Sequence, residues 1–278
     1  MLTTCLAVAH GLPADARANA HCTDTVFVDG FDGALRSPGG SQANIGATIA
    51  LADDGFNFFT LDVHAPESIT TVGSTQGSAF SLAFVDGNFD RAFGLAQDFA
   101  VSPDLLATIR LSDAAITPIG KAVPHNGDWS GFKQDPVSGK LYAVSGCPTG
   151  STLYTVDRNT AAVHTVGNLA GILCAGSVAI DAEGDMYVID VVLDELFAVD
   201  KNDGSTSLIG AVDFDAGVID MDFAASDGAL YVAGRNNSTH RTELREIDPQ
   251  SGTSTWVGVI PVDYVIGFAI ENGVVCTP

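Results

Sequence analysis

The chain has 278 residues, of which 46% are hydrophobic, and its 34 acidic residues against 12 lysines and arginines give a formal net charge of −22. This length suits one large all-β domain or two ordinary domains, and the hydrophobic fraction suffices for a packed core. So much negative charge repels nucleic acid phosphates and anionic membrane surfaces. We therefore expect no nucleic acid partner and no membrane insertion, whereas cationic partners or divalent ions fit the charge.

The first 22 residues contain features of a secretory signal. A short apolar run, Leu6 to Ala9, precedes small-residue sites such as Ala18-Asn19-Ala20, but a positively charged start is missing. Residues 1–22 are thus either a signal or an N-terminal segment. No other stretch approaches the roughly 18 consecutive apolar residues of a membrane helix, and we expect a secreted or cell-surface protein.

Residues 23–56 form an N-terminal arm that lacks the repeat found later in the chain. Its segment TDTVFVDGFDG (Thr23 to Gly33) indicates a strand and a turn. Such a strand either packs on its own domain or adds to the exposed sheet edge of another molecule. The candidate assembly residues are Val26, Phe27, Val28 and Phe31.

From residue 57 onward, one phrase occurs five times: an aliphatic run, a polar turn, and a strand that ends in glycine. The closing glycines, spaced 47, 47, 43 and 48 residues apart, are Gly73, Gly120, Gly167, Gly210 and Gly258. A unit of this length with strand periodicity predicts the blades of a β-propeller.

A second repeated hairpin lies between these phrases, with tight SG, EG, DG or NG turns. The two hairpins together make a four-stranded antiparallel blade, and complete blades are expected at 79–120, 128–167, 175–210 and 218–258. The C-terminal hairpin (264–275) and the N-terminal hairpin (57–73) would make the fifth blade. We therefore predict an all-β, five-bladed β-propeller over residues 57–278 whose ring the two chain ends close. Six blades are the alternative, if residues 24–55 supply another.

The outer strands of the predicted blades lack the usual protection of sheet edges. SITTVG, VHTVG, STSLIG and TSTWVG contain no lysine, and only AITPIG carries a proline, Pro118. Natural edges are blunted by lysine, proline or inward charge. These strands either pair with other molecules or are shielded by neighbouring loops.

Five cysteines favour an oxidising compartment. Cys147 and Cys174 flank one repeat, and a disulfide closing this loop of 28 residues would contribute about 3–4 kcal/mol. A Cys22–Cys276 bridge would join the two chain ends, and Cys5 would then have no partner within the chain.

Two groups of acidic residues are candidate cation sites. Two turns, DAEGD (Asp181 to Asp185) and DKNDG (Asp200 to Gly204), offer oxygen ligands for calcium but read more simply as β-turns. Asp220 and Asp222 alternate along one strand and therefore face the same side. With Asp128 they form our candidate metal or ligand site. We expect no cofactor, and calcium is the one ion that we consider as the alternative.

No motif points to a catalytic nucleophile. His125 lies in a blade-entry loop beside Asp128 and Trp129, but neither a GxSxG turn nor a phosphate-binding glycine loop accompanies it.

The phrases DPVSGKLYAV (Asp135 to Val144) and STLYTVDRNTAAVHTVG (Ser151 to Gly167) resemble the repeats of secreted bacterial β-propellers of the NHL-like and YVTN-like kind. The resemblance covers about residues 57–275. It implies a propeller in an extracellular setting and does not carry over any catalytic residue. Propeller lactonases hold a metal in the central channel, but their full ligand set does not map onto this sequence.

The sequence thus predicts a secreted, non-catalytic β-propeller that acts as a structural or interaction module. Its partner is itself or an extracellular protein, and its most specific form is a polymer built through the N-terminal arm. The alternative is a divalent-metal-dependent hydrolase or lactonase with a site in the central channel.

Overall fold

The computed structural model describes residues 47–52, 57–75, 78–98, 102–124, 126–148, 150–224 and 227–270. The assembly-arm residues, Cys5, Cys22, Cys276 and His125 lie outside these ranges. None of the described residues belongs to a helix that could cross a membrane.

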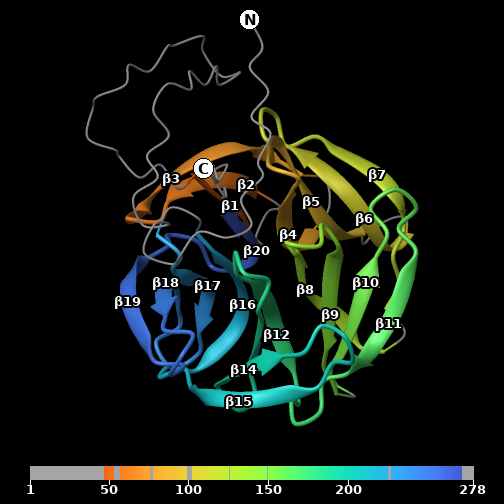
Figure 1. The fold of residues 1–278 in the computed structure, drawn as a ribbon. Helices are drawn as coiled ribbons and strands as arrows, with labels where there is room; N and C mark the ends of the chain where they lie inside the picture. The colour runs from red at the N-terminus through yellow and green to blue at the C-terminus, as the bar shows by residue number, and fades with distance from the viewer. Residues whose placement is uncertain are drawn as a thin grey trace, which may run out of the picture. The chain divides into compact units, whose positions relative to one another are not determined.

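Every regular element in the described part of the chain is a β-strand, and the strands form five four-stranded antiparallel sheets (Figure 1). Four sheets follow the chain in order. They are β4 (Ser78–Val85), β5 (Asn88–Asp98), β6 (Ser102–Arg110) and β7 (Ile116–Lys121); β8 (Asp128–Gln134), β9 (Leu141–Gly146), β10 (Thr152–Val156) and β11 (Val163–Asn168); β12 (Ala175–Ile180), β13 (Met186–Asp190), β14 (Glu195–Val199) and β15 (Thr206–Ala211); and β16 (Ala216–Phe223), β17 (Leu230–Asn236), β18 (Arg241–Ile247) and β19 (Ser254–Val259). The all-β propeller with four-stranded antiparallel blades is thereby confirmed.

The remaining sheet combines segments from both halves of the chain. Its order is β20 (Val265–Ile270), β1 (Ala47–Ala52), β2 (Asn57–Asp62) and β3 (Ala65–Ser74). We expected two strands from each chain end, whereas the described residues supply one C-terminal strand and three N-terminal ones. β1 lies within residues 23–56, which the sequence placed outside the repeat. Its sequence ATIALA lacks the repeated phrase, and its place is fixed by pairing with β2 on one side and β20 on the other.

The core is divided among the contacts between neighbouring sheets. The first strands of the sheets contact one another in the cyclic order β20, β4, β8, β12, β16 and again β20. Five clusters of buried hydrophobic residues each join two adjacent sheets. One of them, for example, packs Phe59 of β2 against Tyr231 of β17. Because the apolar side chains of each sheet are buried by its neighbours, the sheets stabilise one another.

The repeated closing glycine has a packing role in these contacts. Gly167 pairs with Leu153, next to a bulge in the ladder, and a Cβ atom on Gly167 would lie only 1.8 Å from the carbonyl oxygen of Asp203 in the next sheet. A Cβ atom on Gly258 would likewise lie 2.5 Å from Pro66. The glycine therefore recurs because the next blade, through a backbone carbonyl oxygen at Gly167 and through the ring of Pro66 at Gly258, approaches it too closely for a side chain.

A disulfide joins Cys147, in the β9–β10 loop, to Cys174, in the β11–β12 loop, with a Cα–Cα distance of 4.8 Å. This bridge confirms the predicted pairing. It ties a loop within one blade to the segment that leads into the next.

Candidate functional site

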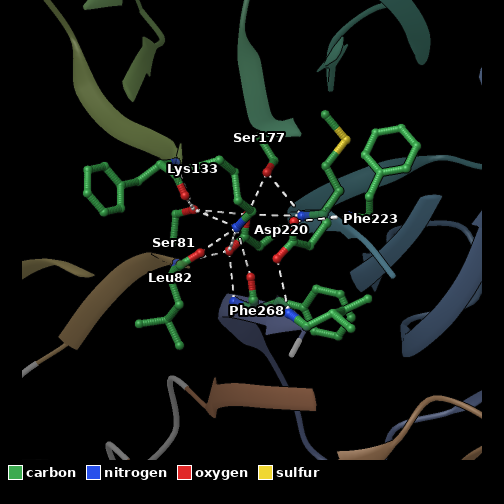
Figure 2. A network of polar contacts seen from close by, with 11 residues as sticks. Ser81, Leu82, Lys133, Ser177, Asp220, Phe223 and Phe268 are labelled. Carbon is green, nitrogen blue, oxygen red and sulfur yellow. Dashed lines mark hydrogen bonds and ion pairs between the residues drawn. The ribbon is translucent and has the colours of Figure 1, made fainter. Parts of the chain in front are cut away.

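The five strands that contact one another in cyclic order, β4, β8, β12, β16 and β20, are called the inner strands. They bring buried polar groups to one centre, where the polar side chains point toward one another (Figure 2). β4 supplies Ser81, β8 supplies Lys133, β12 supplies Ser177, β16 supplies Asp220, and β20 supplies the backbone of Phe268. All five residues are at most 2% exposed. The centre of the sheets is thus occupied by protein groups that are bonded to one another.

The Asp220 carboxylate accepts hydrogen bonds at both oxygens. The Ser177 hydroxyl lies 2.5 Å and the Ser81 hydroxyl 3.0 Å from Oδ1, while the Phe268 amide lies 2.7 Å from Oδ2. Further bonds come from the amides of Leu82 and Met221. So many donors compensate the loss of water around a buried carboxylate.

The Lys133 ammonium supplies the opposite charge. Its Nζ lies 3.4 Å from both Asp220 oxygens, 2.5 Å from the Leu82 carbonyl oxygen and 2.9 Å from that of Phe268. A buried ion pair is tolerated only when further hydrogen bonds satisfy both ions. Here the bonds of Lys133 reach the backbone of β4 and β20. The ion pair therefore connects the sheets of β8 and β16 to those of β4 and β20.

The polar side chains also satisfy the inner edges of the neighbouring strands. The Phe132 amide donates to the Ser81 hydroxyl at 2.8 Å, and the Met221 amide donates to the Ser177 hydroxyl at 3.1 Å. Buried backbone amides without a partner would be costly. Ser81 adopts a positive φ of 52°, at the position where the register of β4 against β5 shifts. This unfavourable conformation places its hydroxyl between Phe132 and Asp220.

Burial shifts the titration of both central acids. Burial raises the pKa of Asp220, while the Lys133 ammonium and the hydrogen-bond donors act in the opposite direction. Burial also raises the pKa of Asp222 to about 6, opposed by Lys133 and by the amides of Ile270 and Phe223. Those amides lie 3.0 Å from the two Asp222 oxygens.

The structure places the predicted site residues in two separate environments. Asp220 and Asp222 are buried on β16, whereas Asp128 is exposed at the first residue of β8. Asp128 precedes Lys133 by five residues, or about 16 Å along a strand. Within the described ranges, no group of three or more His, Cys, Asp or Glu side chains is placed to hold a metal ion. The metal site stays a prediction, and its two buried carboxylates already have protein donors.

The acidic turns have the hydrogen bonds of ordinary β-turns. Asp181 accepts the amides of Glu183 and Asp185 at 3.1 and 2.7 Å, and Asp200 accepts the amide of Asn202 at 2.8 Å. These bonds explain the turn residues without a cation.

Sequence reasoning missed Lys133, Ser81 and Ser177, although the repeated hairpin carries a signal for them. The five inner strands can be aligned on the hydrophobic residue at the middle of each strand, which is Leu82, Phe132, Val178, Met221 or Phe268. The position before this residue holds Ser81, Gly131, Ser177, Asp220 and Gly267. The position after it holds Ala83, Lys133, Ala179, Asp222 and Ala269. Glycine, serine and alanine are the rule at both positions. The three charged exceptions are the ions at the centre.

Comparison with known proteins supports the fold alone. No protein-family model matches the chain, and neither does any curated protein. A chain of the nidogen/laminin complex is similar over 81% of this chain and 98% of its own length, with a TM-score of 0.55 and 9% identity. TolB from Acinetobacter baumannii is similar over 82% of this chain and 67% of its own, with a TM-score of 0.50 and 12% identity. This chain therefore shares the β-propeller fold with proteins of very different sequence.

Proposed function

We propose that this protein is a secreted, non-catalytic β-propeller that acts as a structural or interaction module and associates with further copies of itself. The observation that carries the proposal is the central ion pair. Lys133 and five neutral donors already occupy the Asp220 carboxylate. The bonds at the centre hold the five sheets together. We therefore expect partner molecules to bind on the outer surfaces.

The same ion pair supports a closed ring of five blades. The Phe268 amide donates to Asp220 and its carbonyl oxygen accepts from Lys133, so both ions hold the last strand, β20. β1 pairs with the opposite edge of β20. A strand held on both edges closes the ring and leaves no free inner edge.

The outer strands β15 and β19 are the surfaces that favour self-association. Leu208 of β15 is 57% exposed and Trp256 of β19 is 56% exposed, and neither strand contains lysine. β7, by contrast, carries Pro118 and Lys121. An exposed apolar edge is a template for another strand, and the N-terminal arm with Val26 and Phe27 is our proposed donor.

The Cys147–Cys174 disulfide supports the extracellular location, because structural disulfides persist in oxidising compartments.

Light scattering and electron microscopy of the full chain test self-association. We expect assemblies larger than a monomer, which become smaller in the Leu208→Lys/Trp256→Lys variant and when residues 1–35 are deleted. Thr117→Lys on β7 is the matched control, because Thr117 is exposed on an edge that proline already protects. A monomeric wild-type protein would refute self-association. Unchanged assembly after the deletion would refute the role of the arm alone.

Metal analysis separates this function from the metal-dependent hydrolase. We expect the purified protein to contain no stoichiometric divalent metal. A bound calcium or zinc ion that is lost in the Asp128→Ala variant would favour the hydrolase instead, and Asp128 suits this test because it is exposed.

A further inference from the structure

Three large apolar side chains lie exposed on the loops next to the disulfide. Leu173 in the β11–β12 loop is 53% exposed, and Val192 and Leu193 in the β13–β14 turn are 59% and 42% exposed. The two loops are neighbours, because the Val191 amide donates to the Cys174 carbonyl oxygen at 3.0 Å. Adjacent exposed apolar residues of this size indicate a contact surface.

These side chains are held in place from beneath. The buried Asp190 carboxylate accepts the amides of Leu173 at 2.5 Å, Val192 at 2.8 Å and Leu193 at 3.3 Å. The disulfide fixes the residue that follows Leu173. A surface arranged before binding loses less conformational entropy when a partner docks.

An acidic pocket adjoins these apolar residues. Leu193 lines a cavity of about 420 Å³ together with Asp194, Asp213, Phe214 and Asp215. None of its three aspartates forms an ion pair with a lysine or arginine of the described ranges. Burial, then Asp215 and Asp190, raise the pKa of Asp194, as uncompensated negative charge requires.

Arg245 contacts Phe214, which lines the pocket, but this cation is already paired. The Arg245 guanidinium lies 4.8 Å from the centre of the Phe214 ring, and it bonds to Glu243 at 2.9 Å. Among the bonds described, the three pocket aspartates accept only from neutral donors, namely the amides of Ala216 and Ser254 and the side chains of Asn237 and Ser238, so no cation is paired with them.

We propose that Leu173, Val192 and Leu193, with Asp194, Asp213 and Asp215, form a docking surface for a segment of another protein that carries an apolar residue beside lysine or arginine. The apolar residue contacts the three aliphatic side chains, and the cation enters the acidic pocket. Charge complementarity selects a basic partner over a second copy, because two copies of this surface would bring aspartates against aspartates. The surface lies mainly on the loops, and it borders the proposed self-association strands only at Ala211 of β15 and at Ser254 of β19.

A library of random twelve-residue peptides displayed on phage, selected on the immobilised full-length protein, tests this surface. We expect enrichment of sequences in which an aliphatic or aromatic residue lies within three positions of lysine or arginine. The best peptide, measured by fluorescence anisotropy, should bind at least tenfold more weakly to the Leu193→Ser variant and to the Asp213→Asn/Asp215→Asn variant.

The matched control is Asp200→Asn/Asp203→Asn, which removes the same charge from the exposed β14–β15 turn. It should bind the best peptide like the wild type. Equal weakening by both double variants would mean that net charge alone attracts the peptide and would overturn the proposal. So would the absence of enrichment, or enrichment of basic peptides without an apolar residue. Self-association that is lost in Leu193→Ser would assign the surface to a second copy instead.

Discussion

At the scale of the residue, the centre of the sheets holds one lysine and two aspartates whose roles differ. Asp220 shares the ammonium of Lys133 and accepts two hydroxyl groups, whereas Asp222 accepts only the backbone amides of Ile270 and Phe223 among the bonds described. Asp220 is therefore the partner of the cation. Asp222 has fewer donors, and burial raises its pKa to about 6, while burial raises the pKa of Asp220 as well.

This difference predicts how stability depends on pH. Because the pKa of Asp222 lies above its ordinary value of 3.8 in the folded protein, the folded state holds the proton more tightly than the unfolded state. The protonated Asp222 stabilises the folded state, and this contribution to the free energy of unfolding is complete below about pH 4. It is lost as the pH rises to about 6. By this route the free energy of unfolding falls by about 3 kcal/mol.

Urea unfolding between pH 4 and 7 measures this contribution. The Asp222→Asn variant should show a smaller decrease, because asparagine does not titrate, and the raised pKa of Asp220 accounts for a decrease of the same sign that remains. Asp227→Asn, at an exposed position, should keep the wild-type profile. If Asp222→Asn and the wild type show parallel profiles, Asp222 is not the source of the pH dependence.

The residues of this centre show which kind of contact a sequence reveals. The alternation of Asp220 and Asp222 along one strand predicts correctly that they share a side, because strand periodicity is local. Their partner Lys133 is 87 residues away from Asp220, and only the pairing of sheets brings it near. Alignment of the repeats identifies Lys133 as an exception but does not identify its counter-ion.

At the scale of the element, the repeated phrase predicts the outer hairpins because leucine and glycine mark their paired ends. Leu153 lies opposite Gly167, and Leu244 lies opposite Gly258. β1 has no such mark, since its six small and aliphatic residues fit any buried strand. Its position depends on pairing with β20, more than two hundred residues later, which a local pattern does not contain.

The space around the closing glycines differs from one blade to the next, and this predicts different losses of stability when a side chain is added. Gly167→Ala would place a methyl group 1.8 Å from the Asp203 carbonyl oxygen, whereas Gly73→Ala would place one 3.1 Å from that of Asp113. Overpacking of this kind costs about 1–3 kcal/mol. We expect Gly167→Ala to lower the midpoint of thermal unfolding by several degrees and Gly73→Ala to lower it less. Equal midpoints for the two variants would show that the glycine is not retained for blade spacing.

At the scale of the whole molecule, the ring depends on contacts that join distant parts of the chain. Hydrophobic clusters connect each sheet to its neighbours, but the ion pair is a polar contact that reaches all five inner strands. Lys133 on β8 bonds to Leu82 on β4 and Phe268 on β20, and Asp220 comes from β16. Loss of the lysine should therefore loosen the contacts of β20 with its neighbouring sheets as well as lower global stability.

Lys133→Met tests this role, because methionine keeps much of the volume and removes the charge. Breaking a buried pair leaves the other ion uncompensated and costs about 3–5 kcal/mol. Adding Asp220→Asn to Lys133→Met should recover part of this loss, because it removes the unpaired charge. Lys140→Met, at an exposed position, is the matched control and should leave the free energy of unfolding within about 0.5 kcal/mol of the wild type. Hydrogen exchange should show the Phe268 amide of β20 losing protection before the amides of β13. If Lys133→Met is as stable as Lys140→Met, the apolar clusters alone hold the ring together.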